Sequence, residues 1–214
     1  MRKLRWVGLV VLVGSLFALS GCLFDPLPVA DFDWRPDDPI ARSPVDFTDK
    51  STDSGGLWGI FGMGGIREYS WDFDDSDTST TQNPEHEFQK SGDYAVELTV
   101  KDGGGNVATE KYRIKVRASL DGRWAGTFND NGVPRRLELV ISQTPTAITG
   151  TVFLDAFTFA INSIQLVGNQ VSVAFSIGAN NLVLRGMLDA SETYMQGTYT
   201  VNSVVGFGWD GRLN

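Results

Sequence analysis

The strongest constraint on the fold of this chain is a two-residue alternation of apolar and polar side chains that recurs along most of its length. From residue 28 onward, no segment carries apolar residues at helical spacing over three turns. Short alternating runs are instead separated by glycine, asparagine, aspartate and proline, which is typical of β-strands and the turns between them. The sequence therefore predicts an all-β protein.

Charge divides the chain into two parts. Residues 22–118 hold 19 acidic and 10 basic side chains, whereas residues 119–214 hold 7 and 5, with no lysine. The composition changes near residues 117–119, which we interpret as a short linker. The sequence thus predicts two β-domains, at residues 28–117 and 119–214, with a tether at residues 22–27 before them.

The first 21 residues have the layout of a secretory signal peptide. Arg2, Lys3 and Arg5 precede an almost unbroken apolar run over residues 6–19, and small residues follow that run. The run is shorter than the ~20 residues that a transmembrane helix needs. We therefore expect residues 1–21 to be removed on export, with an uncleaved short membrane anchor as the alternative.

Cys22 is the only cysteine of the chain, so it cannot form an intramolecular disulfide. The sequence Leu19-Ser20-Gly21-Cys22 resembles the lipobox of bacterial lipoproteins. The resemblance implies cleavage after Gly21 and lipidation of the Cys22 sulfur, and two or more acyl chains anchor a protein stably in a membrane. Leu23, in place of an aspartate, is similar to the pattern that sorts lipoproteins to the outer membrane, on either its periplasmic or its outer side.

Nucleic acid is excluded as an expected partner by the charge of the chain. The formal net charge is -8 at pH 7, and removal of three basic residues with the signal peptide makes the mature chain still more negative. Such a surface repels phosphate backbones. The expected partners are membrane lipid at Cys22 and a protein or a polysaccharide.

The first domain is expected to contain a hairpin and at least three further strands. Residues 94–100 and 107–116 alternate on either side of a glycine-rich turn at residues 102–106. The further strands are predicted at residues 30–34, 45–48 and 66–73.

Four stretches of this domain resemble, in order and spacing, the PKD family of immunoglobulin-like domains. They are Tyr69-Ser70-Trp71-Asp72-Phe73-Asp74-Asp75 and residues 45–51, 83–88 and 92–100. The resemblance implies a seven-stranded β-sandwich that serves as a spacer or an interaction module and has no catalytic residues. The usual Gly-Asp-Gly of the family's turn reads Asp74-Asp75-Ser76 here, so the shape of that turn is expected to differ.

A run of aspartates that begins near the end of the predicted strand at residues 66–73 is the candidate metal site, and it comprises Asp72, Asp74, Asp75 and Asp77. Several carboxylate oxygens together can bind calcium, although this run does not match an EF-hand loop. The alternative is a solvated acidic turn without a metal. His86 is the only histidine, and we expect it to form structural hydrogen bonds.

A glycine-rich stretch at residues 55–66 interrupts the family pattern as an insertion, and glycine disfavours a helix there. It carries five large apolar side chains: Leu57, Trp58, Ile60, Phe61 and Met63. Exposed together, these side chains would form a contact for a partner or a membrane. The alternative is that the stretch folds back over its own sheet or the neighbouring domain.

The second domain consists of eight alternating segments of about ten residues, most of them separated by turn residues. Equal strands joined by short turns predict an antiparallel up-and-down meander, which can close into an eight-stranded barrel. Every second residue of these strands is expected to point into the core. The expected inward residues are Leu137, Leu139 and Ile141, then Val171, Val173, Phe175 and Ile177, then Leu182, Leu184 and Leu188, and in the last strand Val205, Phe207 and Trp209. Glycines at positions 126, 150, 186, 197 and 208 are expected to mark bends or bulges in the strands.

The segment Gly122-Arg123-Trp124 resembles the opening of lipocalin-like and avidin-like barrels, and residues 149–151 and 196–199 are similar to the glycine-bearing strands of the avidin-like group. The resemblance implies a cavity for a small ligand at the barrel mouth, which Trp124 and Trp209 could line. An eight-stranded barrel can instead be filled by its own side chains, and both tryptophans would then belong to the core.

Three functions remain open at this point. The favoured one is a non-catalytic, lipid-anchored envelope protein that binds a protein or a polysaccharide, as an adhesion or scaffold module. The second is a carrier of a small apolar ligand in the C-terminal barrel. An enzyme is the third, but no pair of carboxylates or nucleophile with a base stands out, so no catalytic residue and no cofactor other than calcium is predicted.

Overall fold

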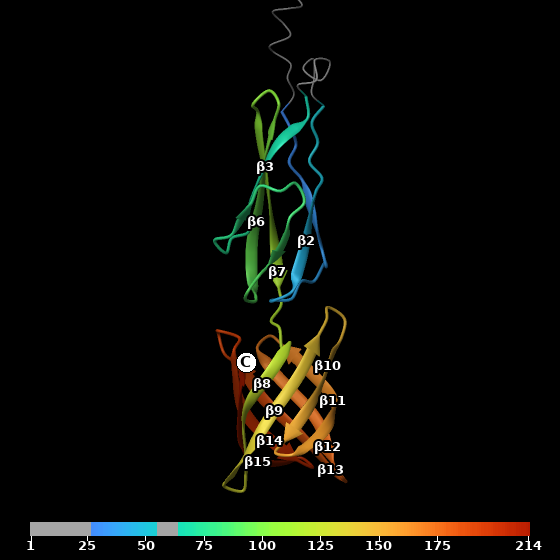
Figure 1. Ribbon diagram of the computed structural model, residues 1–214, viewed down its shortest axis with the longest axis vertical. Helices are drawn as coiled ribbons and strands as arrows, with labels where there is room; N and C mark the ends of the chain where they lie inside the picture. The colour runs from blue at the N-terminus through green and yellow to red at the C-terminus, as the bar shows by residue number, and fades with distance from the viewer. Residues whose placement is uncertain (1–26, 55–63) are drawn as a thin grey trace, which may run out of the picture. The chain divides into compact units, whose positions relative to one another are not determined.

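The computed structural model describes residues 27–54 and 64–214, and within these ranges the protein consists of β-strands without helices, as the alternation predicted (Figure 1). No helix in the described ranges is long and apolar enough to span a membrane. The chain divides into two compact units. One contains two sheets of a sandwich and the other a closed barrel.

The sandwich pairs a sheet of three strands with a sheet of four, which agrees with the expected seven strands. The first sheet has the order β1-β2-β5 and contains β1 (Phe32–Arg35), β2 (Pro44–Asp49) and β5 (Glu85–Glu87). The second has the order β4-β3-β6-β7 and contains β3 (Ile66–Asp72), β4 (Thr78–Ser79), β6 (Gly92–Asp102) and β7 (Val107–Val116).

Aromatic side chains from both sheets fill the space between them. Trp71 of β3 is fully buried, and its ring centroid lies 5.0 Å from that of Phe32 in β1 and 5.6 Å from that of Phe47 in β2. Alternation places every second residue of each strand on this inner face. The aromatic cluster therefore holds the two sheets face to face.

The turn between β6 and β7 falls where it was predicted. Asp102 ends β6, and its carboxylate accepts hydrogen bonds from the backbone and side-chain nitrogens of Asn106. Burial alone would raise the pKa of Asp102, but the bonds from Asn106, Gly104 and Gly105 outweigh it and lower the pKa. Gly105 takes a φ of 93°, a conformation that glycine adopts at little cost.

The second unit is a closed barrel of eight antiparallel strands in which every strand pairs with its sequence neighbour and β15 pairs with β8. This is the predicted up-and-down meander. The strands are β8 (Gly122–Asp130), β9 (Val133–Gln143), β10 (Ile148–Leu154), β11 (Phe157–Val167), β12 (Gln170–Ile177), β13 (Asn180–Leu188), β14 (Tyr194–Val201) and β15 (Val204–Leu213).

The barrel interior is filled by side chains. Leu137, Leu139 and Ile141 of β9 point inward as predicted, and they pack in one cluster with Trp124 and Trp209. Alternation therefore identified most of the core, since inward and outward positions follow a strict period of two in a regular strand.

The prediction for the start of β15 was wrong. Val205 is 70% exposed and Phe207 is 50% exposed, whereas both were expected to point inward. The register shifts between Thr198 and Thr200 of β14, so that β15 has one additional residue there. Such a bulge turns the preceding residues to the opposite face, and the buried ring of Tyr199 takes the inward place.

Four of the five strand glycines lie where neighbouring backbones approach closely. A Cβ built at Gly126, Gly150, Gly186 or Gly197 would lie 1.9–2.5 Å from a carbonyl oxygen of the adjacent strand. Side chains do not fit at such distances, so these glycines permit the tight coiling of the barrel. Gly208 differs, because its Cβ would have ordinary contacts, the nearest at 3.5 Å.

Candidate functional site

The acidic run forms the turn between β3 and β4, and backbone bonds fix its shape. The carboxylate of Asp72 accepts a hydrogen bond from the Asp74 nitrogen at 2.9 Å, and that of Asp75 accepts one from the Asp77 nitrogen at 3.2 Å. Asp74 and Ser76 take φ values of 63° and 82°. Both values lie in the left-handed region, which aspartate tolerates better than most residues.

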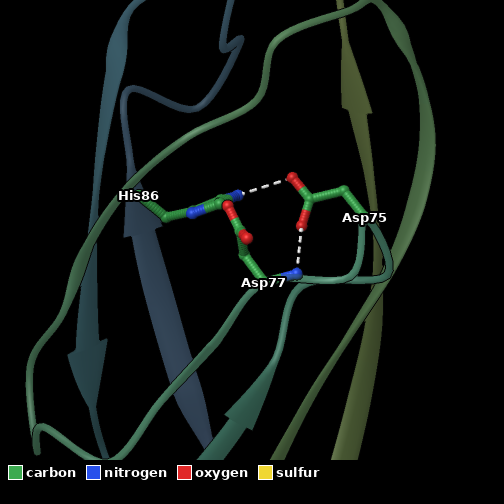
Figure 2. A group of neighbouring side chains, drawn as sticks. All are labelled: Asp75, Asp77 and His86. Atoms are coloured by element: carbon green, nitrogen blue, oxygen red, sulfur yellow. Dashed lines mark hydrogen bonds and ion pairs between the residues drawn. The ribbon is translucent and has the colours of Figure 1, made fainter.

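His86 of β5 lies against this turn (Figure 2). Its Nε2 is 2.7 Å from Oδ2 of Asp75, and its ring stacks on Phe73 with centroids 4.0 Å apart and an angle of 6°. The histidine is only 8% exposed. The expected structural role of His86 agrees with these contacts, since a buried polar ring is stabilised by a hydrogen bond.

The structure divides the four aspartates into two groups. Asp75 and Asp77, together with His86, have potential ligand atoms that all lie within 4.8 Å of one another. Asp72 does not belong to this group, nor does Asp74, whose carboxylate accepts a hydrogen bond from the backbone nitrogen of Ala95 at 2.9 Å. Sequence reasoning left His86 out of the set because residues 75 and 86 become neighbours only when the two sheets pack, with β5 in one sheet and the turn between β3 and β4 in the other.

The donors of this group are two carboxylates and an imidazole. Calcium binds oxygen ligands, whereas an imidazole suits transition metals better. The calcium site at Asp72, Asp74, Asp75 and Asp77 therefore stays a prediction. Calorimetric titration with millimolar calcium tests it, and a titration without heat of binding would contradict it.

Two of the predicted sites lie outside the described residues. These are the lipidation site Cys22 and the apolar stretch with Leu57, Trp58, Ile60, Phe61 and Met63. The two tryptophans predicted to line a ligand pocket are both part of the barrel core. Trp124 is fully buried and donates to the Leu120 carbonyl at 2.8 Å, and Trp209 is 3% exposed and donates to the Thr198 carbonyl at 3.1 Å.

One end of the barrel has a small apolar pocket of about 340 Å³. Antiparallel connection brings the β10–β11 and β12–β13 turns to the same end of the barrel, and the pocket lies there. Its apolar lining comprises Phe128, Leu154, Phe157, Phe159 and Ile177. Phe157 is 67% exposed, so this end presents an aromatic surface to the surroundings.

A larger groove of about 1000 Å³ runs over the outer face of the barrel across β11–β15 and the adjoining β8. Its side chains are mostly uncharged and polar, and they include Thr127, Asn129, Gln165, Gln170, Ser172, Gln196 and Thr198. The sequence shows these residues only as the polar half of an alternation. Their assembly into one surface depends on the register between strands.

Comparison with known proteins assigns the first unit. Residues 28–116 match the PKD domain family. A stretch of 53 residues is 43% identical to Collagenase ColA of Clostridium perfringens, and it covers 25% of this chain but only 5% of that protein.

Two solved structures are also similar. The PKD1 domain of the Vibrio cholerae metalloprotease PrtV is 34% identical, with a TM-score of 0.36 over 42% of this chain and 98% of that domain. A carbohydrate-binding module of the β-sandwich superfamily is 19% identical, with a TM-score of 0.40 over 89% of this chain and 86% of that one. Both scores are below 0.5, so the assignment rests on the family match. Residues 28–116 form a PKD domain.

Proposed function

We propose that this protein is a non-catalytic binding module of the bacterial cell envelope, anchored by lipid at Cys22, whose barrel binds a polysaccharide or a protein. The observation that carries the proposal is the contrast between the two sides of the barrel wall. Side chains fill the interior, whereas the outer face has a groove of about 1000 Å³ lined by polar side chains. Binding sites are concave surfaces with a few well-placed polar groups. The groove on the outer face is larger than the apolar pocket of about 340 Å³ at the end of the barrel.

The anchor is supported by the sequence at the start of the chain, where a basic segment, an apolar run and Leu19-Ser20-Gly21-Cys22 follow one another. We expect the Cys22→Ser variant to leave the membrane fraction, because the thiol that accepts the lipid is gone. Fractionation of cells that produce the tagged wild type or the variant measures this. A variant that stays in the membrane fraction would contradict lipid anchoring at Cys22.

The same pair of proteins tests the side of the envelope on which the module acts. Protease and antibody access on intact cells, lost in the variant, would favour adhesion or capture outside the cell. Protection until the outer envelope is opened would favour a role in the periplasm.

A non-catalytic role is supported by the state of the groups that could act as acid or base. His86 is engaged by Asp75 and stacked on Phe73. In the groove, the only charged side chains among the described lining residues are Arg185 and Asp210. One hydrogen-bonded carboxylate and one guanidinium do not provide the pair of titratable groups that acid–base catalysis needs.

The apolar stretch with Trp58 and Phe61 remains a second proposed contact for a partner. Calcium binding at the acidic turn also remains a proposal. Both rest on the sequence. Neither is required for binding in the groove.

A small apolar ligand carried at the end of the barrel is the alternative function, and the pocket of about 340 Å³ favours it. Its volume lies near the lower limit of roughly 300 Å³ for ligand sites. If the pocket binds such a ligand, a nonpolar fluorescent probe will bind the wild type and the Phe157→Ser variant will bind it more weakly. Equal fluorescence with both proteins would contradict the carrier function.

A further inference from the structure

We propose that the groove on the outer face of the barrel is a binding site for an uncharged polysaccharide. This inference rests on the proposed function and gives it a ligand class. It is carried by the alignment of side chains across five strands, by the charge of the lining and by Gly208.

Strand register assembles the groove from two parallel rows of outward residues. One row runs Gln165–Ser172–Arg185–Thr198–Gly208, and each member pairs with the next on the neighbouring strand from β11 to β15. The other row runs Val167–Gln170–Met187–Gln196–Asp210 in the same way.

The two rows form a track suited to an extended ligand. Adjacent strands are separated by about 4.8 Å, so five strands make each row about 19 Å long. Corresponding positions in the two rows are two residues apart along a strand, or about 7 Å. A ligand of repeating units can contact several of these positions at once.

The lining offers hydrogen bonds of both kinds. Glutamine amides donate and accept, as do the hydroxyls of Ser172 and Thr198. Arg185 has no ion-pair partner among the described residues, and its guanidinium carries five N–H donors. Asp210 accepts from the nitrogen and hydroxyl of Thr127 at 2.7 and 2.8 Å through one carboxylate oxygen. Its second oxygen can accept a hydrogen bond from a sugar hydroxyl.

The charges of the lining favour an uncharged ligand. Arg185 and Asp210 cancel each other, and the chain as a whole has a formal net charge of -8. A polyanion needs a cluster of lysines or arginines, which this surface lacks among its described residues. Sugar hydroxyls, which donate and accept without charge, match the amides and hydroxyls of the two rows.

A protein partner fits the same surface less well. Energetically important positions in protein interfaces are enriched in tryptophan, tyrosine and arginine, and the interface core is apolar. Among the lining side chains, the exposed large apolar ones are Val167 and Met187, and the single aromatic, Trp209, is 3% exposed.

Gly208 is the position that distinguishes the groove from an ordinary barrel wall. Glycine weakens a strand, and within a strand it often marks a place where a ligand or another backbone approaches closely. A Cβ at Gly208 would have its nearest contact at 3.5 Å, and its φ is not in the left-handed region, so the fold does not require glycine there. Because Gly208 has no side chain, space remains for a ligand at the β15 end of the row that begins with Gln165.

The proposal is tested by affinity gel electrophoresis of the full chain in gels that contain a soluble uncharged glucan, a galactomannan or an acidic polysaccharide such as alginate. We expect an uncharged polysaccharide to retard the wild type. Gly208→Gln fills the groove and is expected to raise the apparent Kd at least tenfold. Arg185→Ala is expected to raise it as well.

Ala160→Gln is the matched control, because Ala160 is an exposed residue of β11 outside the groove. It is expected to bind like the wild type. Thermal unfolding of each variant shows whether the barrel is intact.

Three results would overturn the inference: retardation by alginate alone, retardation unaffected by Gly208→Gln, or no retardation by any of the polysaccharides. If no polysaccharide retards the protein, crosslinking in cells shows whether the groove binds a protein instead, or nothing. A protein captured by the wild type but not by Gly208→Gln would leave the binding module in place with a protein partner. No captured partner and no polysaccharide would contradict both.

Discussion

Replacing Gly197 by alanine is expected to destabilise the barrel by about 3 kcal/mol or more, near the upper limit for overpacking. The new Cβ would lie 1.9 Å from the carbonyl oxygen of Arg185 and 2.4 Å from the Cα of Gly186. Both contacts are with backbone atoms of the paired strand β13, so no side-chain rotation relieves them. Urea denaturation followed by circular dichroism measures the free energy of unfolding.

Gly208→Ala is the matched control for this substitution. It adds the same methyl group to the next strand, where the nearest contact is 3.5 Å away. The variant is expected to be as stable as the wild type or more stable by up to about 1 kcal/mol, because alanine restricts the unfolded chain. Equal losses in both variants would show that close backbone approach is not what requires glycine at position 197.

Replacing Trp71 by alanine is expected to cost about 3–5 kcal/mol of stability in the PKD domain, as for other buried aromatic side chains. Trp71 is fully buried, and it contacts aromatic rings of the facing sheet at 5.0 and 5.6 Å. Its indole nitrogen also donates to the Thr81 carbonyl at 2.9 Å. The variant therefore loses packing between the two sheets together with a hydrogen bond.

Trp71→Phe separates these two contributions. It retains an aromatic ring and removes the donor to Thr81, so a loss of about 1–3 kcal/mol is expected. The same denaturation experiment on the full chain compares the two variants. If Trp71→Ala were no less stable than Trp71→Phe, the aromatic packing would not be what holds the two sheets together.

The barrel core shows how far local sequence reasoning extends. Val171, Val173 and Phe175 alternate along β12, and all three are buried. The prediction succeeded because the side-chain period of a strand is two, whatever the strand pairs with. The same rule failed for Val205 and Phe207, since one additional residue in β15 changes the face and nothing in the local pattern marks it.

The candidate sites, unlike the barrel core, depend on contacts between residues that are far apart in the sequence. Asp75 and His86 are 11 residues apart in sequence, yet they form a bond of 2.7 Å because β5 passes the turn after β3. The groove joins residues that lie even further apart in the sequence. Gln165 and Gly208 belong to one row, which four successive strand pairings assemble. A shift of one residue in any of these registers would break the row.

Local patterns in the sequence were enough to predict that this chain is all-β, where most of its strands and turns lie, which side chains fill most of the barrel core and that residues 28–117 resemble a PKD domain. These properties depend on neighbouring residues, through the period of a strand and the conformational preferences of turn residues. Three further properties follow only from the folded chain: the barrel closes and is filled, His86 lies against the acidic turn, and ten outward residues form a groove. These properties depend on contacts between distant segments, which strand register and the packing of the two sheets fix and no local pattern records.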